Sequence, residues 1–409
     1  MKKLLKIKLH WQILIALILA VLYGLFFPNG IKYVSWMGEI FLTALKMVII
    51  PLILSSIISG VTSMGGGSSL GRLGAKTMLY YFTTSIFAIL TGLLLVNLIK
   101  PGVGVELGFS ENIESITENM GSVSNILFRI VPSNIFEAMT RGDILPVIFF
   151  SILFGMFITQ VKRKYRKALT VFFEAVFEVM MKMTMFIIRF TPLGIFGIVA
   201  KEVHRNADQL SQVAGSMAIY MLTIFLALAI HAFITLPLIL RLIAKVKPFR
   251  HMSNMATPLI TAFSTASSSA TLPLTMEAVE HKSGVSNKIT SFTLPLGATV
   301  NMDGTALYEC VAAIFIAQVY GVEMDFLQQL LVVVTALLAS IGAAGIPMAG
   351  LVMLTIILTV AGLPLEGIGL ILAVDLVLDM SRTTVNVWSD SCGAVTIARS
   401  EKEKTNVAI

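Results

Sequence analysis

The chain has 409 residues, of which 56% are hydrophobic and 13% are charged, and its mean hydropathy is +0.88. So apolar a composition excludes an ordinary soluble protein and is typical of one that lies in a membrane. The net charge of +7 is carried by basic clusters in short loops. That distribution is a topology signal of membrane proteins and does not indicate nucleic-acid binding.

Several apolar runs are long enough to cross a bilayer as helices, which takes about 18 to 20 residues. They are continuous and do not alternate with polar residues, which excludes a β-barrel. The first predicted span, 13–27, follows an N-terminus with four lysines and therefore starts in the cytoplasm. The second covers about 35–63. The Gly-rich segment 65–74 lacks the Lys-Ser/Thr pair of a phosphate loop, so we expect a flexible connector.

A third span is predicted at about 77–99, and the glutamate-containing segment 101–121 after it suits the outer side. The region 125–161 is predicted to form two or three helical pieces. It is interrupted by three residues that break helices: Pro132, Gly142 and Pro146.

The segment 162–167 carries five cations in six residues, which favours a cytoplasmic loop over a nucleic-acid patch. A fifth span is predicted at about 168–203 and a sixth at about 215–244, with a basic exit. Both termini are then expected in the cytoplasm. The loops alternate accordingly: 72–76, 162–167 and 241–250 face inward, and 100–121 and 204–212 face outward.

Beyond residue 250 the apolar segments are interrupted by small and polar residues. Two of them, about 254–285 and about 327–363, are predicted to be hairpins that enter and leave on one side. Irregular backbone at membrane depth is tolerated where it lines a cavity, and paired broken segments mark the binding site of a transporter.

Between the hairpins, a span at about 290–319 contains the sequence NMDGTALYE from Asn301 to Glu309. Gly304 predicts local unwinding. Free carbonyls there, together with the side chains of Asn301 and Asp303, would supply hard oxygen ligands that suit alkali cations. An Asp at this position could also cap the continuing helix.

The last span, about 366–398, carries a polar stripe. Its members are spaced 4, 3, 4 and 4 residues apart and share one helix face: Asp375, Asp379, Arg382, Asn386 and Asp390. Charged side chains inside a membrane mark a substrate or ion pathway. A buried ion pair between Asp379 and Arg382 is the structural alternative, but it leaves Asp375 and Asp390 unexplained.

Other chemistry finds less support. The two cysteines, Cys310 and Cys392, lie in apolar stretches and indicate neither a disulfide nor a thiol nucleophile. The serine run at 267–269 would suit close helix packing. As a hydrolase nucleophile it would need a nearby base, and His231 is the only histidine in the middle of a predicted span. We therefore predict that the protein is not an enzyme.

Four motifs occur in a fixed order: TASSSATLP, LPLGATVNMDGTALYE, SIGAAGIPMAGL and LDMSRTTVNVWSD. Together they resemble the dicarboxylate/amino acid:cation symporters, the family of archaeal aspartate transporters and animal excitatory amino acid transporters. The resemblance covers essentially the whole chain and is strongest over 255–400.

The resemblance implies an all-α polytopic membrane protein with eight transmembrane helices and two opposed re-entrant helical hairpins, working by an elevator mechanism as a homotrimer. A scaffold (1–75 with spans 1 and 2, and 122–203 with spans 4 and 5) would surround a mobile transport domain. That domain would comprise 76–121, with span 3 and an outer loop, and 204–409, with span 6, both hairpins, span 7 and span 8.

By matching position, Arg382 would bind the side-chain carboxylate of the substrate, which suits its planar guanidinium. Its presence favours glutamate or aspartate over a neutral amino acid. Asp379 would hold the substrate ammonium group. The remaining residues implied to contact or surround the substrate are Ser267, Ser268, Thr305, Ile346, Gly350, Thr383 and Asn386.

The resemblance also implies three sodium sites. One would use Asn386 and Asp390 with carbonyls of Gly297 and Asn301. A second would use Asn301 and Asp303 with Tyr81, Thr84 and Ser85. A third would be built from Thr299, Met302, Ser340 and Ile341.

The chain departs from the family pattern at two positions. Archaeal members have a second arginine where this chain has Ala266, and animal members have one where it has Met380. The partner of Asp379 and potassium counter-transport are therefore left open. Glu309 matches the glutamate that carries the co-transported proton in animal members, and burial would favour its protonated form.

The function implied is symport of L-glutamate or L-aspartate across a bacterial plasma membrane. Na⁺ is expected as the co-transported ion, with H⁺ as a candidate second one. Bringing one cation inward down 100 mV releases about 2.3 kcal/mol, which could concentrate an anionic substrate. A symporter driven by protons alone is the main alternative. A neutral amino acid transporter and an Asp-lined ion channel are weaker ones.

Overall fold

The computed structural model describes residues 9–63, 68–104, 131–142, 144–205, 210–342 and 349–409. Within these ranges the regular structure is helical, apart from one isolated antiparallel bridge between Val246 and Ala408. The prediction of an all-helical chain is therefore confirmed for the described residues.

The first half of the chain contains two long helices, at 35–63 and 68–99, with shorter helices before and after them. Its elements are α1 (Leu9–Phe26), the 3₁₀ helix η2 (Pro28–Tyr33), α2 (Ser35–Ser63), α3 (Ser68–Ile99), α6 (Ile135–Arg141), α7 (Ile144–Gln160), α8 (Arg163–Ile188) and α9 (Thr191–Arg205).

The second half contains two π-helical turns, η4 and η5, and ends in the long helix α19. Its elements are α10 (Leu210–Ile230), η4 (His231–Thr235), α11 (Leu236–Leu242), α12 (Pro248–Asn254), α13 (Ala256–Thr265), α14 (Ser268–Glu277), η5 (Ala278–Lys282), α15 (Asn287–Val300), α16 (Asp303–Val319), α17 (Phe326–Gly342), α18 (Ala349–Val360), the 3₁₀ turn η6 (Leu365–Gly367) and α19 (Ile368–Ser400).

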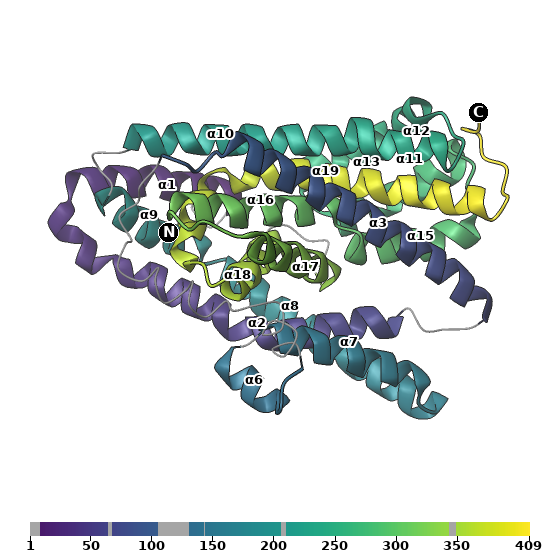
Figure 1. The fold of residues 1–409 in the computed structure, drawn as a ribbon, viewed down its shortest axis with the longest axis horizontal. Coiled ribbons are helices and arrows are strands. Elements are labelled where there is room, and N and C mark those ends of the chain that lie inside the picture. Colours follow the sequence, from purple (N-terminus) through teal and green to yellow (C-terminus); the bar gives the residue numbers. More distant parts are fainter. Residues whose placement is uncertain (1–8, 64–67, 105–130, 143, 206–209, 343–348) are drawn as a thin grey trace, which may run out of the picture.

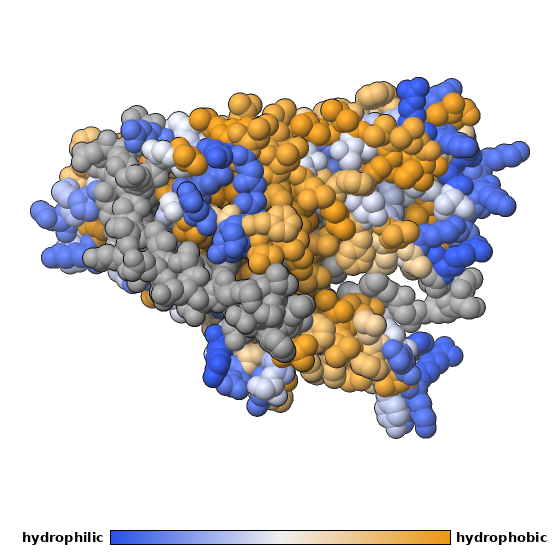
Figure 2. All heavy atoms as spheres, in the orientation of Figure 1, coloured by the Kyte–Doolittle hydropathy of each residue, from blue (hydrophilic) through white to orange (hydrophobic). Residues whose placement is uncertain are grey.

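Four helical segments of the described chain are long and apolar enough to cross a membrane. They are Ser35–Thr62, Arg72–Ile99, Gln212–Leu242 and Asn287–Val319, and the bent pair of α8 and α9 could form a fifth. Figure 2 shows apolar residues gathered in a broad middle region of the visible face and hydrophilic residues toward the two ends of the long axis. Both findings indicate a membrane protein.

The helices pack in two groups. In the first, α2 packs against α7, α8 and α9, and α1 packs against α9. In the second, α16 packs against α3, α17 and α19, and α10 lies beside both α3 and α19 (Figure 1). Every residue of α16 except Gln318 is buried, so α16 forms the centre of the second group.

Both predicted hairpins consist of two helical arms. The arms of the first are α13 and α14, and they contact each other. Ala266 ends α13 in the left-handed region, with φ of 48°, a conformation that costs an L-residue about 1–2 kcal/mol. This turn lies inside the TASSSATLP motif, as predicted. The arms of the second are α17 and α18, and the residues 343–348 between them lie outside the described ranges.

The central span is broken inside the NMDGTALYE sequence, where local unwinding was predicted, but the break precedes the glycine. Unwinding was expected at Gly304, whereas the break falls at Asn301 and Met302, and Gly304 already belongs to the first turn of α16. The glycine has a different role: a Cβ atom there would lie 2.7 Å from the Arg382 carbonyl oxygen. Gly304 therefore permits the close approach of α16 and α19.

Three other expectations were wrong in detail. The predicted connector 65–74 is helical from Ser68, because α3 begins there. The predicted basic loop 162–167 is helical from Arg163, where α8 begins. The predicted fifth span, 168–203, is two helices that meet at an angle of 52°. Pro192 explains this break, since proline has no N–H to continue the hydrogen-bonded ladder of α8.

Candidate functional site

Helix α19 carries the polar stripe predicted from its spacing. All five side chains, those of Asp375, Asp379, Arg382, Asn386 and Asp390, are buried. Burying charged groups is costly unless they are paired or hydrogen-bonded. The contacts of this stripe therefore show what the site can bind.

Arg382 is the most enclosed charge of the stripe, with none of its surface exposed. Its Nη2 atom lies 2.9 Å from Asp379 Oδ1 and 3.2 Å from Asp375 Oδ1. The guanidinium carbon sits 3.7 Å from the centre of the Tyr308 ring, a cation–π arrangement. Asp379 and Asp375 thus share one arginine, so a buried ion network accounts for Asp375 as well, which the sequence argument had left unexplained.

The other two guanidinium nitrogens, Nε and Nη1, have no hydrogen-bond partner among the described residues. Nη1 faces the second hairpin, where a Cβ atom added to Gly350 would lie 3.0 Å from it. A buried guanidinium with free N–H donors in a fixed fork can bind a ligand's carboxylate by donating hydrogen bonds to its oxygens. Gly350 thus lies beside Arg382, and its role in lining a substrate pocket stays a prediction. Ile346 lies outside the described residues.

The first hairpin contributes Ser267 and Ser268, both buried. Ser267 caps α14, with its hydroxyl accepting a hydrogen bond from the Ala270 N–H at 3.2 Å. Capping the helix is therefore a structural role for Ser267. A binding role for either serine stays a prediction.

Asn386 connects α19 to the first turn of α16. Its Oδ1 accepts from the Gly304 N–H at 2.8 Å, and its Nδ2 donates to Thr305 Oγ1 at 3.0 Å. Thr383, one turn earlier on α19, is buried. The structure therefore brings Asn386 and Thr305 into direct contact, while both polar ends of Asn386 are already engaged by α16.

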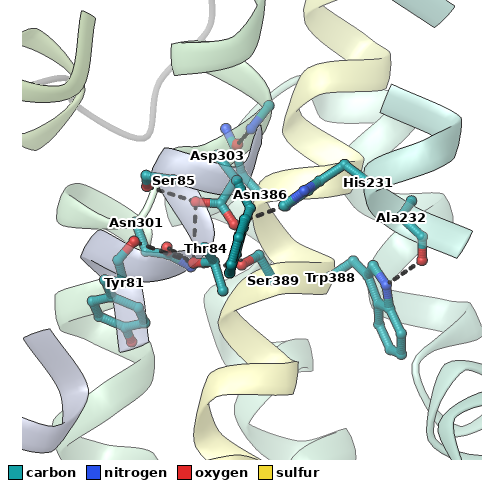
Figure 3. Close-up of polar contacts among 12 residues, drawn as sticks. Tyr81, Thr84, Ser85, His231, Ala232, Asn301, Asp303, Asn386, Trp388 and Ser389 are labelled. Atoms are coloured by element: carbon teal, nitrogen blue, oxygen red, sulfur yellow. Dashed lines mark hydrogen bonds and ion pairs between the residues drawn. The ribbon is translucent and has the colours of Figure 1, made fainter. Parts of the chain in front are cut away.

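Asp303 is the centre of a second polar cluster, which Figure 3 shows. Its Oδ1 accepts from Ser85 Oγ at 2.6 Å and from Thr84 Oγ1 at 3.3 Å. Its Oδ2 contacts Ser389 Oγ at 2.6 Å and His231 Nε2 at 3.1 Å. Asn301 Oδ1 lies 3.4 Å from Thr84 Oγ1. Carboxylate, hydroxyl and carboxamide oxygens of this kind suit a hard monovalent cation.

Three residues of this cluster were expected in it and two were not. Thr84, Ser85 and Asn301 gather around Asp303 as the resemblance implied. Ser389 and His231 were missed. A histidine in the middle of an apolar span is itself a signal of function, and it could have identified His231.

Tyr81 reaches the Asp303 cluster through its backbone, because its carbonyl accepts from Thr84 Oγ1 at 3.2 Å, while its side chain points to another group. Its hydroxyl donates to the Thr293 carbonyl at 2.7 Å, and no hydrogen bond joins it to Asp303 in the described part of the chain. A Cβ atom added to Gly297 would lie 2.7 Å from that hydroxyl. The Tyr81 hydroxyl therefore lies with Gly297 and the neighbouring Asp390, and a role of Tyr81 in the Asp303 site stays a prediction.

Asp390 accepts from Asn301 Nδ2 at 2.9 Å, and Asn301 also donates to Ser389 Oγ at 3.1 Å. Asn301 thus joins Asp390 to the Asp303 cluster. The structure places Asp390 next to both Gly297 and Asn301, the residues with which it was expected to form a site. Asn386, expected in the same site, has both polar ends bonded to α16 instead.

Among the described side chains assigned to a third sodium site, no hydrogen bond joins one to another. Thr299 is exposed, and its hydroxyl donates to the Leu296 carbonyl at 3.0 Å. Ser340 donates to the Leu337 carbonyl at 2.8 Å. Met302 is buried, and for Ile341 only the backbone is described. Within the described ranges no hydrogen bond links Thr299 to Ser340, so this site stays a prediction.

Glu309 lies in α16, next to the Tyr308 that stacks on Arg382. It is fully buried, and neither carboxylate oxygen has a hydrogen-bond partner among the described residues. Since an unpaired buried charge is costly, this carboxylate is suited to carrying a proton.

Comparison with known proteins identifies the family. The model of the sodium:dicarboxylate symporter family matches residues 9–400. The chain belongs to this family.

Curated relatives agree with that assignment along nearly the full chain. The proton/sodium-glutamate symport protein of Geobacillus stearothermophilus is 36% identical over 406 residues, which cover 97% of this chain and 95% of that protein. An excitatory amino acid transporter of Caenorhabditis elegans is 38% identical, covering 90% and 81%. The proton/glutamate-aspartate symporter of Escherichia coli is 33% identical, covering 97% and 93%. Membership in a transporter family agrees with the prediction that the protein does not act as an enzyme.

Proposed function

We propose that the protein is a secondary active symporter that imports L-glutamate or L-aspartate together with Na⁺, and that Glu309 adds a coupled proton. The observation that carries the proposal is the buried Arg382 guanidinium, whose Nε and Nη1 have no partner among the described residues and whose Nη1 faces Gly350. The relatives named above are glutamate symporters and excitatory amino acid transporters.

The Arg382–Asp379 ion pair indicates how the substrate would bind. An acidic amino acid carries an ammonium group and a side-chain carboxylate, which are the counterparts of Asp379 and Arg382. Binding would replace one internal ion pair by two intermolecular ones, so no buried charge would lose its partner. Thr305, Thr383, Asn386, Gly350 and the hairpin serines would complete the pocket, and Ile346 is proposed to face it.

We propose two cation sites on the described side chains, one at Asp303 and one at Asp390. Asn301 contacts both groups. Filling them with Na⁺ would neutralise two buried carboxylates, and each ion would contribute about 2.3 kcal/mol per 100 mV of inside-negative potential. The third site, at Thr299, Met302, Ser340 and Ile341, is proposed on resemblance alone.

The architecture that we propose has eight transmembrane helices, two opposed re-entrant hairpins, cytoplasmic termini and a homotrimeric assembly in a bacterial inner membrane. The two packing groups of the fold support a division into a scaffold (1–75 and 122–203) and a transport domain (76–121 and 204–409). The second group would slide across the membrane as a rigid unit, which is the elevator mechanism. The substrate would be bound between α19 and the hairpins during this movement.

Uptake of labelled L-glutamate and L-aspartate into proteoliposomes tests the proposal. An inward sodium gradient at constant pH should drive accumulation. An outside-acidic pH gradient without sodium should drive accumulation only if protons alone suffice. Proton-driven symport is the second candidate function, and it is favoured by Glu309, whose carboxylate has no hydrogen-bond partner among the described residues. Uptake under neither gradient would refute the role assigned to Arg382.

A further inference from the structure

The middle of the span Gln212–Leu242 contains a feature that neither the motifs nor the proposed function assigns. Helix α10 changes at His231 into the π-helical turn η4. His231 is fully buried, and its Nε2 lies 3.1 Å from Asp303 Oδ2. Because a carboxylate only accepts hydrogen bonds, the imidazole Nε2 carries the hydrogen.

The π-helical turn has an identifiable cause. Pro237 has no N–H to donate to carbonyls of the preceding turn, and the Leu236 N–H bonds to the His231 carbonyl, five residues back. The Ala232 carbonyl, five residues before Pro237, instead accepts from Trp388 Nε1 of α19 at 3.0 Å (Figure 3). Such single π turns occur mostly at functional sites, and this one is held in place by the binding helix.

The two oxygens of Asp303 face different partners. Oδ1 meets the hydroxyls of Ser85 and Thr84 on α3. Each hydroxyl can rotate and offer a lone pair to an arriving cation. Oδ2 meets Ser389 and His231, and the imidazole N–H can only donate. A cation is therefore accommodated on the Oδ1 side, and His231 holds the opposite oxygen.

We propose that His231 is a positioning residue for the cation site. Its N–H fixes the orientation of the Asp303 carboxylate, so that Oδ1 faces Ser85, Thr84 and Asn301. This inference rests on the sodium coupling proposed above. Hydrogen bonds that orient a metal ligand typically change metal affinity 10- to 100-fold when they are removed.

Two substitutions separate this role from simple packing. His231→Leu removes the donor, whereas His231→Gln keeps an amide N–H close to the position of Nε2. Thr223→Val is a matched control on the same helix, because Thr223 is buried and its hydroxyl donates to the Ile219 carbonyl of its own helix, with no other partner among the described residues. Sodium affinity is measured on purified protein by the rise in melting temperature with Na⁺, at constant ionic strength with choline and without substrate.

His231→Leu should raise the Na⁺ concentration for half-maximal stabilisation, and for half-maximal glutamate uptake, by about 10- to 100-fold. The KM for glutamate at saturating Na⁺ should stay within about twofold of wild type, since His231 lies on the Asp303 side and not at Arg382. His231→Gln should restore most of the sodium affinity, and Thr223→Val should leave it unchanged.

An unchanged sodium midpoint in His231→Leu, or an equal loss in His231→Gln, would overturn the inference. If His231→Leu does not fold, His231→Asn replaces it, because the shorter amide does not reach Oδ2 and must also raise the midpoint. A wild-type protein that transports glutamate without any response to Na⁺ would refute the sodium coupling, and the inference with it. A sodium-dependent wild type with unaffected variants would refute the inference alone.

Discussion

Gly297 of α15 and Asp390 of α19 are packed so closely that a Cβ atom on the glycine would lie 2.8 Å from the Asp390 carboxyl carbon. The same atom would lie 2.7 Å from the Tyr81 hydroxyl. Only a residue without a side chain fits between these two groups. This contact determines where the Asp390 carboxylate points.

Gly297→Ala is therefore expected to displace Asp390 and to weaken sodium binding by at least tenfold. Overpacking a filled site also costs about 1–3 kcal/mol of stability. The sodium dependence of glutamate uptake measures the first effect and melting temperature the second. Gly215→Ala is the control, since a Cβ there has no neighbour within 4 Å. Equal sodium midpoints in the two variants would contradict the assignment of Asp390.

Arg382→Lys should raise the KM for glutamate by at least 30-fold. The ammonium keeps the charge but loses the fork that binds a carboxylate bidentately, and breaking a buried charge pair costs about 2–5 kcal/mol. Competition by unlabelled glutamate and aspartate measures the change. Arg399→Lys on the same helix is the control, because Arg399 bonds to backbone carbonyls of Ala244 and Glu403 away from the stripe. Wild-type affinity in Arg382→Lys would exclude a direct contact with the substrate carboxylate.

Gly350→Ala should alter substrate binding without altering sodium binding. Its Cβ would lie 3.0 Å from Arg382 Nη1, so the guanidinium must move by a few tenths of an ångström. We expect the KM for glutamate to rise about tenfold, because small misplacements of binding groups are costly. The sodium midpoint measured without substrate should stay constant. Gly74→Ala, whose Cβ would meet only Phe292 at 3.6 Å, provides the comparison, and identical KM values would refute the predicted contact.

The polar stripe of α19 and the first hairpin were predictable because both depend on local pattern. The regular spacing of the five polar residues between Asp375 and Asp390 places them on one face of a helix. A run of small residues with a proline favours a turn. The break at Pro192 was equally local, but the sequence prediction treated 168–203 as one span despite this proline.

Contacts between distant segments were not predictable in the same way. His231 and Asp303 are 72 residues apart in sequence, and no periodicity links α10 to α16. The pairing of Asp379 with Arg382 was left open, because a second arginine known from the family is absent here. Gly304 was misinterpreted for a related reason. A glycine in a helix can indicate unwinding or close packing, and only the position of Arg382 decides between them.

Glu309→Gln should preserve glutamate uptake but abolish its response to an outside-acidic pH gradient. The amide has nearly the same shape and cannot carry a proton. Glu366→Gln serves as the control, since Glu366 is exposed on η6. Initial uptake rates at several outside pH values, with a fixed sodium gradient, are the measurement. Retained uptake with wild-type pH dependence would rule out Glu309 as the proton carrier.

His251 gives the protein a pH-dependent stability that is independent of transport. It lies in α12, between the sixth span and the first hairpin, and is fully buried. Its Nδ1 lies 2.8 Å from Ser283 Oγ, and its ring packs on Trp388 with 5.2 Å between centroids. Burial lowers the pKa of His251 from 6.5 to about 4. The folded protein therefore holds this imidazole neutral, whereas the unfolded chain protonates it near pH 6.5.

Between pH 6.5 and 4 the unfolded chain binds one proton more than the folded protein. Unfolding is then favoured as the pH falls, and the free energy of unfolding decreases by about 3 kcal/mol across this window. We expect His251→Gln, which cannot titrate, to lose less stability than wild type over the same range. Melting temperatures in detergent from pH 8 to 4 measure the difference. His281→Gln is the control, because His281 is exposed. Parallel curves for wild type and His251→Gln would show that His251 does not cause the acid sensitivity.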